Sequence, residues 1–331
     1  MTNVESSLAA AASLLGDRLG ARLERDVSLA AMTTYRVGGA AALFVDIGST
    51  DDLIAVAEAR VETGVPVLVI GRGSNMLVAD HGYRGIAISI ANFADQIDIP
   101  QVPAGRRIVT GGGGVALPVL ARRTAAAGLT GFEWAVGVPG SIGGAVKMNA
   151  GGHGSDMAAS LLDVLVFDMN CPSAAAHRIP VEQLGLRLRA SALPSSAVIL
   201  EARLGLADGD RHTAEAELTE IVRWRREHQP GGQNCGSVFV NPVPGEVAAG
   251  RLIDGIGLRG FRIGSAWVSE KHANFIQAGE GGTAADVRAV IETVRNSVAE
   301  QTGYRLRTEV RLVGFDDTDP LSFDDVMAEP I

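Results

Sequence analysis

The sequence predicts a protein of two or three domains in which helices and strands are mixed. Three observations support this prediction. The chain has 331 residues, which is more than one hydrophobic core usually serves. Its first part alternates strand, helix and strand patterns. The pattern then changes after the polar, glycine-containing stretch at residues 208–210, which marks a domain boundary.

The alternation begins with a strand–helix–strand unit. Residues 41–47 read as a short apolar strand and residues 65–70 as a fully buried one. Between them, Ser49 is a helix N-cap and Gly64 ends the helix. Two strands joined by a helix in this way predict a parallel sheet.

The remaining elements follow from the same apolar periodicities and glycine signals. Before the boundary we expect strands at 86–90, 108–110, 162–167 and 197–202, a four-glycine turn at 111–114, a helix at 117–127 ended by Gly128, and a long glycine-rich loop at 137–154. After it we expect a helix at 213–227, a long helix capped by Thr283 and ended by Gly303, and a closing strand at 306–313 with alternating apolar residues.

The charge and the cysteine content of the chain indicate which kinds of ligand and partner to expect. The formal net charge of −9 argues against binding to nucleic acid or to an anionic membrane, so any phosphate site must be local. Cys171 and Cys235 have neither a metal-ligand spacing nor the number needed for a disulfide framework, so no metal site is expected. No apolar run reaches the ~20 residues that span a bilayer. Residues 4–19 read as an amphipathic helix rather than a signal peptide, which predicts a cytoplasmic protein.

Three glycine-rich segments are candidates for ligand binding. Residues 71–75 follow a buried strand, where they form either an anion-binding turn or a plain turn. Residues 137–145 interleave four glycines with apolar residues. We favour a ligand there, because an irregular buried loop would leave many N–H groups unpaired. Residues 33–39 end in a glycine pair after Arg36, and they read equally as an ordinary strand entry.

Seven segments in this order resemble one family, the UDP-N-acetylenolpyruvoylglucosamine reductases, within the vanillyl-alcohol-oxidase-like FAD superfamily. They are TTYRVGG at 33–39, GRGSNMLV at 71–78, GVPGSIGG at 137–144, MNAG at 148–151, CGSVF at 235–239, SEKHANF at 269–275 and TEVR at 308–311. The resemblance covers nearly the whole chain, and the short stretch between residues 202 and 213 matches the compact subtype.

The resemblance implies an α+β fold, with a two-subdomain FAD-binding (PCMH-type) fold and a C-terminal α+β substrate-binding domain. The implied boundaries are residues 1–88 and 89–208 for the FAD-binding subdomains, 209–304 for the substrate domain, and 305–331 for a strand and tail that return to the FAD domain. It also implies non-covalent FAD, NADPH as reductant, and a small-molecule substrate, the enolpyruvyl ether of a UDP-sugar, which is reduced to UDP-N-acetylmuramate for peptidoglycan.

The same resemblance implies the site residues. The expected cofactor-binding residues are Tyr35, Arg36, Gly38, Gly71, Arg72, Gly73, Ser74, Asn75, Gly137, Gly140, Ser141, Gly143 and Gly144. The expected substrate-binding residues are Asn241 and His272, with Asn274 a weaker candidate.

Three residues are implied as catalytic. Ser237 would protonate the carbanion left by hydride addition, Glu309 would polarise that intermediate, and Arg189 would clamp the substrate carboxylate. Arg187 is the alternative arginine, because Leu188 stands where the family has a tyrosine.

Two further departures bear on substrate choice. Val240 replaces a residue that is often basic in the family, and Trp267 replaces a common glutamine. Two other functions therefore stay open on the same fold. One is a sugar or alcohol oxidase, although Ala40 and Ala41 stand where such enzymes often tether FAD through a histidine. The other is a non-catalytic flavin-binding paralogue.

Overall fold

The structure is a computed structural model that describes residues 2–100 and 107–316, so the expected tail beyond Asp316 lies outside the described residues. The chain divides into two compact units that are each assembled from separate segments. The first consists of Met1–Asp26, Ala42–Arg72 and Arg84–Arg225. The second consists of Val27–Ala41, Gly73–Tyr83 and Arg226–Ile331.

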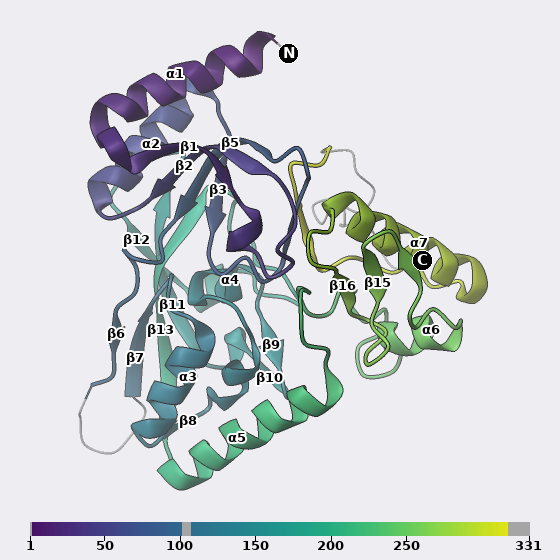
Figure 1. Cartoon of the computed structure of the whole chain (residues 1–331). Helices are drawn as coiled ribbons and strands as arrows, with labels where there is room; N and C mark the ends of the chain where they lie inside the picture. Colours follow the sequence, from purple (N-terminus) through teal and green to yellow (C-terminus); the bar gives the residue numbers. More distant parts are fainter. Residues whose placement is uncertain (1, 101–106, 317–331) are drawn as a thin grey trace. The chain divides into compact units, whose positions relative to one another are not determined.

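The first unit begins with a four-stranded sheet in the order β1-β2-β5-β3, in which β3 and β5 are parallel. Its strands are β1 (Leu23–Ser28), β2 (Ala40–Asp46), β3 (Val67–Ile70) and β5 (Tyr83–Ser89). Helices α1 (Thr2–Leu19) and α2 (Thr50–Thr63) lie side by side (Figure 1). Buried residues of these helices and strands, such as Leu15, Val56 and Ile88, share one apolar cluster. The expected strand–helix–strand unit is confirmed, with β5 placed between its two strands.

The predicted helix ends are confirmed in atomic detail. The Asp52 N–H donates to the Ser49 hydroxyl at 3.2 Å, and Gly64 ends α2 with a left-handed φ of 70°. Helix α7 (Ala284–Thr302) is built in the same way, because the Asp286 N–H donates to Thr283 Oγ1 at 3.1 Å. Such caps satisfy main-chain groups that the first and last turns leave without a helical partner.

The rest of the first unit surrounds a six-stranded sheet in the order β12-β11-β13-β7-β6, with β8 paired to β13. Its strands are β6 (Ile97–Asp98), β7 (Arg107–Gly112), β8 (Leu129–Thr130), β11 (Leu161–Asp168), β12 (His177–Pro180) and β13 (Ala197–Asp208). The other elements are α3 (Leu117–Ala126), α4 (Ile142–Lys147), α5 (Arg211–His228) and the hairpin of β9 (Gly151–Gly152) and β10 (Ser155–Asp156). A cluster that includes Val109, Leu120 and Ile221 joins the sheet to α3 and α5.

The second unit has its own core. It contains α6 (Ala249–Gly255), α7 and the antiparallel sheet of β14 (Arg262–Ile263), β15 (Ala266–Val268) and β16 (Ile276–Ala278), together with the parallel pair β4 (Met76–Val78) and β17 (Arg311–Val313). The inner face of α7 packs on this sheet through an apolar cluster that includes Val287, Ile291 and Val268. In Figure 1 the helices α6 and α7 and the strands β15 and β16 are drawn in colours from green to olive.

Three sequence predictions differ from the structure. The expected loop at 137–154 contains helix α4 and the β9–β10 hairpin. In the expected four-glycine turn, Gly111 and Gly112 belong to strand β7. The closing strand is regular only over 311–313, although the predicted alternation is confirmed because Leu306, Thr308 and Val310 are all buried. Strands β7 and β17 have these bounds because they pair with the distant strands β13 and β4.

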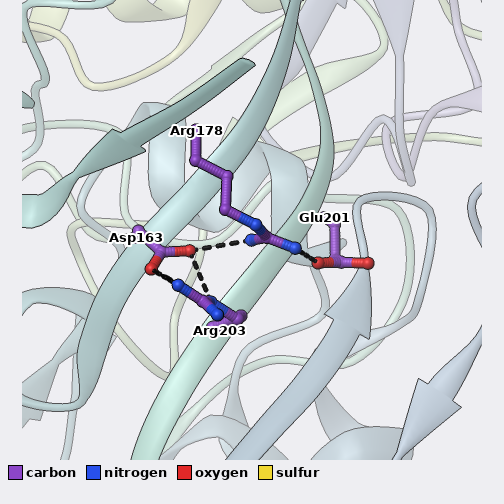
Figure 2. A network of polar contacts seen from close by, with 4 residues as sticks. All are labelled: Asp163, Arg178, Glu201 and Arg203. Atoms are coloured by element: carbon purple, nitrogen blue, oxygen red, sulfur yellow. Dashed lines mark hydrogen bonds and ion pairs between the residues drawn. The ribbon is translucent and has the colours of Figure 1, made fainter. Parts of the chain in front are cut away.

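A four-residue ion network lies on the larger sheet of the first unit (Figure 2). Asp163 of β11 accepts from Arg203 Nε of β13 at 2.8 Å and from Arg178 Nη1 of β12 at 2.8 Å. Arg178 also pairs with Glu201. Hydrogen bonds from Arg203, and then those from Arg178, lower the pKa of Asp163. The network therefore ties three neighbouring strands through one nearly buried carboxylate.

Asp163→Asn is expected to lower the free energy of unfolding at pH 7 by about 1–2 kcal/mol, since both arginines keep substantial solvent contact. A folded pKa below the unfolded value of about 3.9 stabilises the fold above that pH, and the stabilisation is lost as the pH falls through the folded pKa. The difference between wild type and variant should therefore shrink on acidification, as measured by urea unfolding. The exposed Asp17→Asn is the matched control. A constant difference from pH 7 to the acid limit would contradict this account.

Candidate functional site

The turn that follows β3 presents free main-chain donors. Among the described residues, no protein acceptor takes the N–H groups of Arg72, Gly73, Ser74 or Asn75. Consecutive amides on a glycine turn form a concave site for an anion. Arg72 is exposed, and its guanidinium makes no ion pair within the described chain. The turn that reads ambiguously in the sequence thus has the donors that a phosphate-bearing ligand needs.

Within the second unit, the glycine-pair segment at 33–39 packs directly on residues 73–78. The Thr34 N–H donates to the Gly73 carbonyl at 3.2 Å. A Cβ at Gly73 would enter the Met32 carbonyl oxygen and lie 2.8 Å from Thr33 Cα, and Gly38 lies just as close to Val78. These glycines are therefore needed first for main-chain packing, which brings the two segments together.

The side chains of the 33–39 segment divide into buried and exposed groups. Tyr35 is fully buried beside Cys235, and burial raises the pKa of its hydroxyl well above the usual range. Only its main chain could reach a cofactor. The buried Thr34 hydroxyl has no hydrogen-bond partner in residues 2–100 and 107–316. Arg36 is exposed with a left-handed φ of 54°, a conformation that is strained in a residue with a side chain.

The loop at 137–144 differs from the expectation of unpaired amides. The Gly140, Ile142 and Gly143 N–H groups donate to Val138, Val115 and Gly113 carbonyls at 2.8–2.9 Å. Ser141 caps α4, and a Cβ at Gly71 would collide with its hydroxyl. The inference from unsatisfied N–H groups was therefore wrong. Its glycines allow close packing of the loop on the β7 end and on residue 71.

Arg189 is held in place within the first unit. It has a left-handed φ of 59°, and its guanidinium Nη2 donates to the Gly151 carbonyl at 3.2 Å. Asn149 donates to the Arg187 carbonyl at 3.3 Å, so the MNAG segment contacts the same turn. Residues 187–190 form a tight turn rather than a strand, so a shift by one strand repeat does not apply. Leu188 is exposed at the turn.

Asn149 is a positioning residue that the sequence prediction of the site omits. Its Oδ1 accepts from the Ala158 N–H at 3.1 Å, and its Nδ2 also donates to Asp156 at 3.1 Å. With φ at 39°, it is one of few described non-glycine residues in the left-handed region. Its place inside the MNAG motif was the signal that could have found it.

Ser237 and Glu309 lie on adjacent segments of the second unit. The Glu309 N–H donates to the Val238 carbonyl at 2.7 Å, and the Asn75 side chain donates to the Glu309 carbonyl at 2.7 Å. The Ser237 hydroxyl has no hydrogen-bond partner among the described residues. Burial, with the Glu309 charge nearby, raises the pKa of Cys235 to about 12. The main chain of Glu309 is thus held between the segment that carries Ser237 and the Asn75 side chain.

The expected substrate contacts already have partners in the fold. Asn241 Oδ1 accepts from the Ala249 N–H at 3.0 Å, at the start of α6. His272 Nδ1 accepts from the Asn274 N–H at 3.2 Å, and burial lowers the pKa of its ring. Asn274 is buried and pairs with the Phe239 main chain through both side-chain atoms. Asn274 is therefore a structural residue. Of the other two, Asn241 Nδ2 and His272 Nε2 have no protein partner among the residues that the structure describes.

Two residues that depart from the family pattern are also accommodated. Val240 is nearly buried beside the Phe239 segment. Trp267 lies under the Arg262 guanidinium, which is 4.3 Å from the ring centre. A hollow of the first unit, lined by Thr130, Ser160 and Asp208 among others, contains none of the predicted site residues. No described helix has the length and apolar composition of a membrane span.

Comparison with known families gives two matches. Residues 41–170 match the family model described as an FAD binding domain. Residues 228–313 match the model described as the C-terminal domain of UDP-N-acetylenolpyruvoylglucosamine reductase. The motifs at 71–75 and 137–144 lie in the first match, and Ser237 and Glu309 lie in the second.

Curated relatives match over most of their length. UDP-N-acetylenolpyruvoylglucosamine reductase from Heliobacterium modesticaldum is 42% identical over 286 residues, which cover 85% of this chain and 88% of the relative. The enzyme from Synechococcus sp. strain RCC307 is 41% identical over 295 residues, which cover 88% and 94%. The crystal structure of the Thermus caldophilus reductase matches 88% of this chain and 99% of its own, with 34% identity and a TM-score of 0.74.

Proposed function

The chain belongs to the family of UDP-N-acetylenolpyruvoylglucosamine reductases, and from this we infer that it is an FAD-dependent oxidoreductase that reduces UDP-N-acetylglucosamine enolpyruvate to UDP-N-acetylmuramate with NADPH. The fold is the expected α+β one, with an FAD-binding domain and the family's C-terminal domain. The reaction supplies a peptidoglycan precursor and so serves cell-wall synthesis. NADPH and UDP-sugar substrates support a cytoplasmic location.

The observation that carries this proposal is the run of free amides at residues 72–75. In a protein with a net charge of −9, neutral main-chain donors are the means of holding a dinucleotide diphosphate. The exposed guanidinium groups of Arg36 and Arg72 supply the local positive charge. Bound FAD supplies the hydride carrier between NADPH and the enolpyruvyl group.

The chain's own residues handle the carboxylate and the proton. Arg189 binds the substrate carboxylate through its planar guanidinium and draws negative charge toward it. Glu309 polarises the developing enolate, as a carboxyl group does when it donates a hydrogen bond. Ser237, whose hydroxyl is free, gives its proton to the carbanionic carbon. Hydride and proton together saturate the double bond.

The test is substrate-dependent NADPH consumption by the purified yellow protein. We expect oxidation of NADPH only when the enolpyruvyl sugar nucleotide is present, and release of free flavin on denaturation. Oxygen consumption with a sugar or alcohol donor would instead support an oxidase. A protein that holds flavin but turns over no pyridine nucleotide would be a binding paralogue. A protein that takes up no flavin would overturn the proposal.

Exchange of Arg189 for methionine should lower kcat/KM for the sugar nucleotide by about 10²-fold or more, because a bidentate carboxylate contact is lost. Arg187→Met, two residues away and exposed, is the matched control and should change kcat/KM little. Steady-state assays at several substrate concentrations separate KM from kcat. A large loss of kcat/KM in Arg187→Met, with little change in Arg189→Met, would show that Arg187 binds the substrate carboxylate.

A further inference from the structure

Arg225 is an arginine of α5 that none of the motifs contains. It lies against the turn that begins the 137–144 loop, where a Cβ at Gly137 would be 3.1 Å from Arg225 Cδ and 3.1 Å from Ile221 Cγ2. Ile221, one turn earlier, belongs to the core of the first unit. The aliphatic stem of Arg225 therefore packs on the Gly137 turn, and the guanidinium is held near it.

The charge of Arg225 has no acid to balance it. Arg211 and Arg223 on the same helix pair with Glu215 and Glu220, whereas no carboxylate pairs with Arg225 among the described residues. Burial alone lowers the pKa of Arg225. A partly desolvated cation without a partner is costly, and such cations are normally paired.

The acids on the neighbouring elements do not compensate for this charge. Glu217 of α5 interacts with Glu133 of the segment before Gly137, and burial followed by that like charge raises the pKa of Glu217. Neither acid forms an ion pair with Arg225 within the part of the chain that the structure describes. Within the described residues Arg225 is therefore left without a counter-charge, which makes it available to an anionic ligand.

The ring of His153 lies at the same turn, and it contacts the ring of Trp224. His153, in the turn of the β9–β10 hairpin, has its Nε2 3.3 Å from the Gly137 Cβ position. Its ring meets Trp224 edge to face, with centroids 5.1 Å apart. Burial, with the Arg225 charge second, lowers the pKa of His153. His153 thus reports the charge at Arg225.

We propose that Arg225, presented at the Gly137 turn beside His153, binds the diphosphate of a nucleotide ligand. This inference rests on the proposed function, because FAD, NADPH and the UDP-sugar all carry that group. Gly137 lies within the residues that match an FAD binding domain, so FAD is the expected source. A guanidinium matches phosphate oxygens through two parallel hydrogen bonds.

The test compares Arg225→Met with Arg223→Met, which removes an exposed charge from the same helix. Methionine keeps the stem that packs on Gly137. We expect Arg225→Met to weaken FAD retention by the holoenzyme about 10- to 100-fold, as loss of a charged hydrogen bond does. Arg223→Met should leave retention unchanged. If FAD retention is unchanged, separate titrations with UDP and NADP⁺ show which of these nucleotides loses affinity for Arg225→Met.

A second readout does not depend on activity. The pKa of the His153 ring is measured by NMR against pH in the holoenzyme. If Arg225 binds FAD, removal of FAD should lower this pKa. If Arg225 instead binds UDP or NADP⁺, saturation with that nucleotide should raise it. Arg225→Lys should keep this response and lose part of the affinity, even if the methionine variant folds poorly.

Equal affinities of wild type and Arg225→Met for FAD, UDP and NADP⁺, with an unmoved His153 pKa, would overturn the inference. Failure of the proposed function looks different, because the wild type itself would then hold no flavin. The UDP and NADP⁺ titrations would still test Arg225 in that case.

Discussion

Ser237→Ala is expected to slow reduction of the sugar nucleotide by about 10²- to 10⁴-fold, the usual contribution of a positioned general acid. The loss should fall on the second half-reaction alone, because the hydroxyl has no role in hydride transfer from NADPH. The Ser237 hydroxyl has no partner within the described chain, so its removal leaves no buried group unsatisfied. The fold should therefore keep its stability.

Stopped-flow measurement of the two half-reactions tests this. NADPH should bleach the flavin absorbance of Ser237→Ala at the wild-type rate, and the sugar nucleotide should restore it slowly. Glu309→Gln serves as the comparison, since it keeps the shape of the second catalytic candidate and its Val238 contact. Wild-type reoxidation in Ser237→Ala would remove Ser237 from the mechanism. Slowed flavin reduction would indicate a cofactor-binding role instead.

Gly73→Ala is expected to lower the free energy of unfolding by about 3 kcal/mol or more, because two costs combine. The residue has a left-handed φ of 56°, which an alanine adopts only with strain. The added methyl would also enter the Met32 carbonyl and press on Thr33 Cα. Flavin affinity should fall as well, because the displaced main chain belongs to the 72–75 turn.

Gly257→Ala is the matched control for the conformational part. Gly257 has a φ of 76°, and a Cβ there meets nothing within 4 Å. It should cost about 1 kcal/mol. Urea unfolding gives the loss of unfolding free energy for each variant. The loss in Gly73→Ala minus the loss in Gly257→Ala is the cost of the steric clash. Equal losses would show that the 33–39 segment moves away from Gly73 at little cost.

The helix ends could be predicted from the sequence because their causes are local. A Ser49 or Thr283 hydroxyl reaches an N–H three residues on, and Gly64 or Gly303 supplies the left-handed residue. No distant segment is needed for either effect. The same locality explains why the buried alternation around Thr308 could be read correctly although the regular strand is shorter.

The candidate site could be predicted only as a set of residues. The sequence order of the motifs indicates a family, but pairing of Asn75 with Glu309 and of Tyr35 with Cys235 depends on contacts between distant segments. Amides of the 137–144 loop donate to carbonyls near residue 113. These contacts join distant segments, so the sequence around the loop does not predict them. The assignment of the catalytic and binding residues to roles stays a prediction, as does the division of the chain into four segments.

The pairing of β4 with β17 has a consequence for biosynthesis. Asn75 and Glu309 are 234 residues apart. Strand β4 follows Asn75 and strand β17 follows Glu309, and among the described strands each pairs only with the other. A ribosome that adds roughly 5–20 residues per second needs on the order of tens of seconds to bridge that interval. Until residues 311–313 have been synthesised, β4 lacks the partner strand with which it pairs in the fold. Chaperone protection of the nascent chain, and intolerance of stop codons before residue 311, are therefore expected of this architecture.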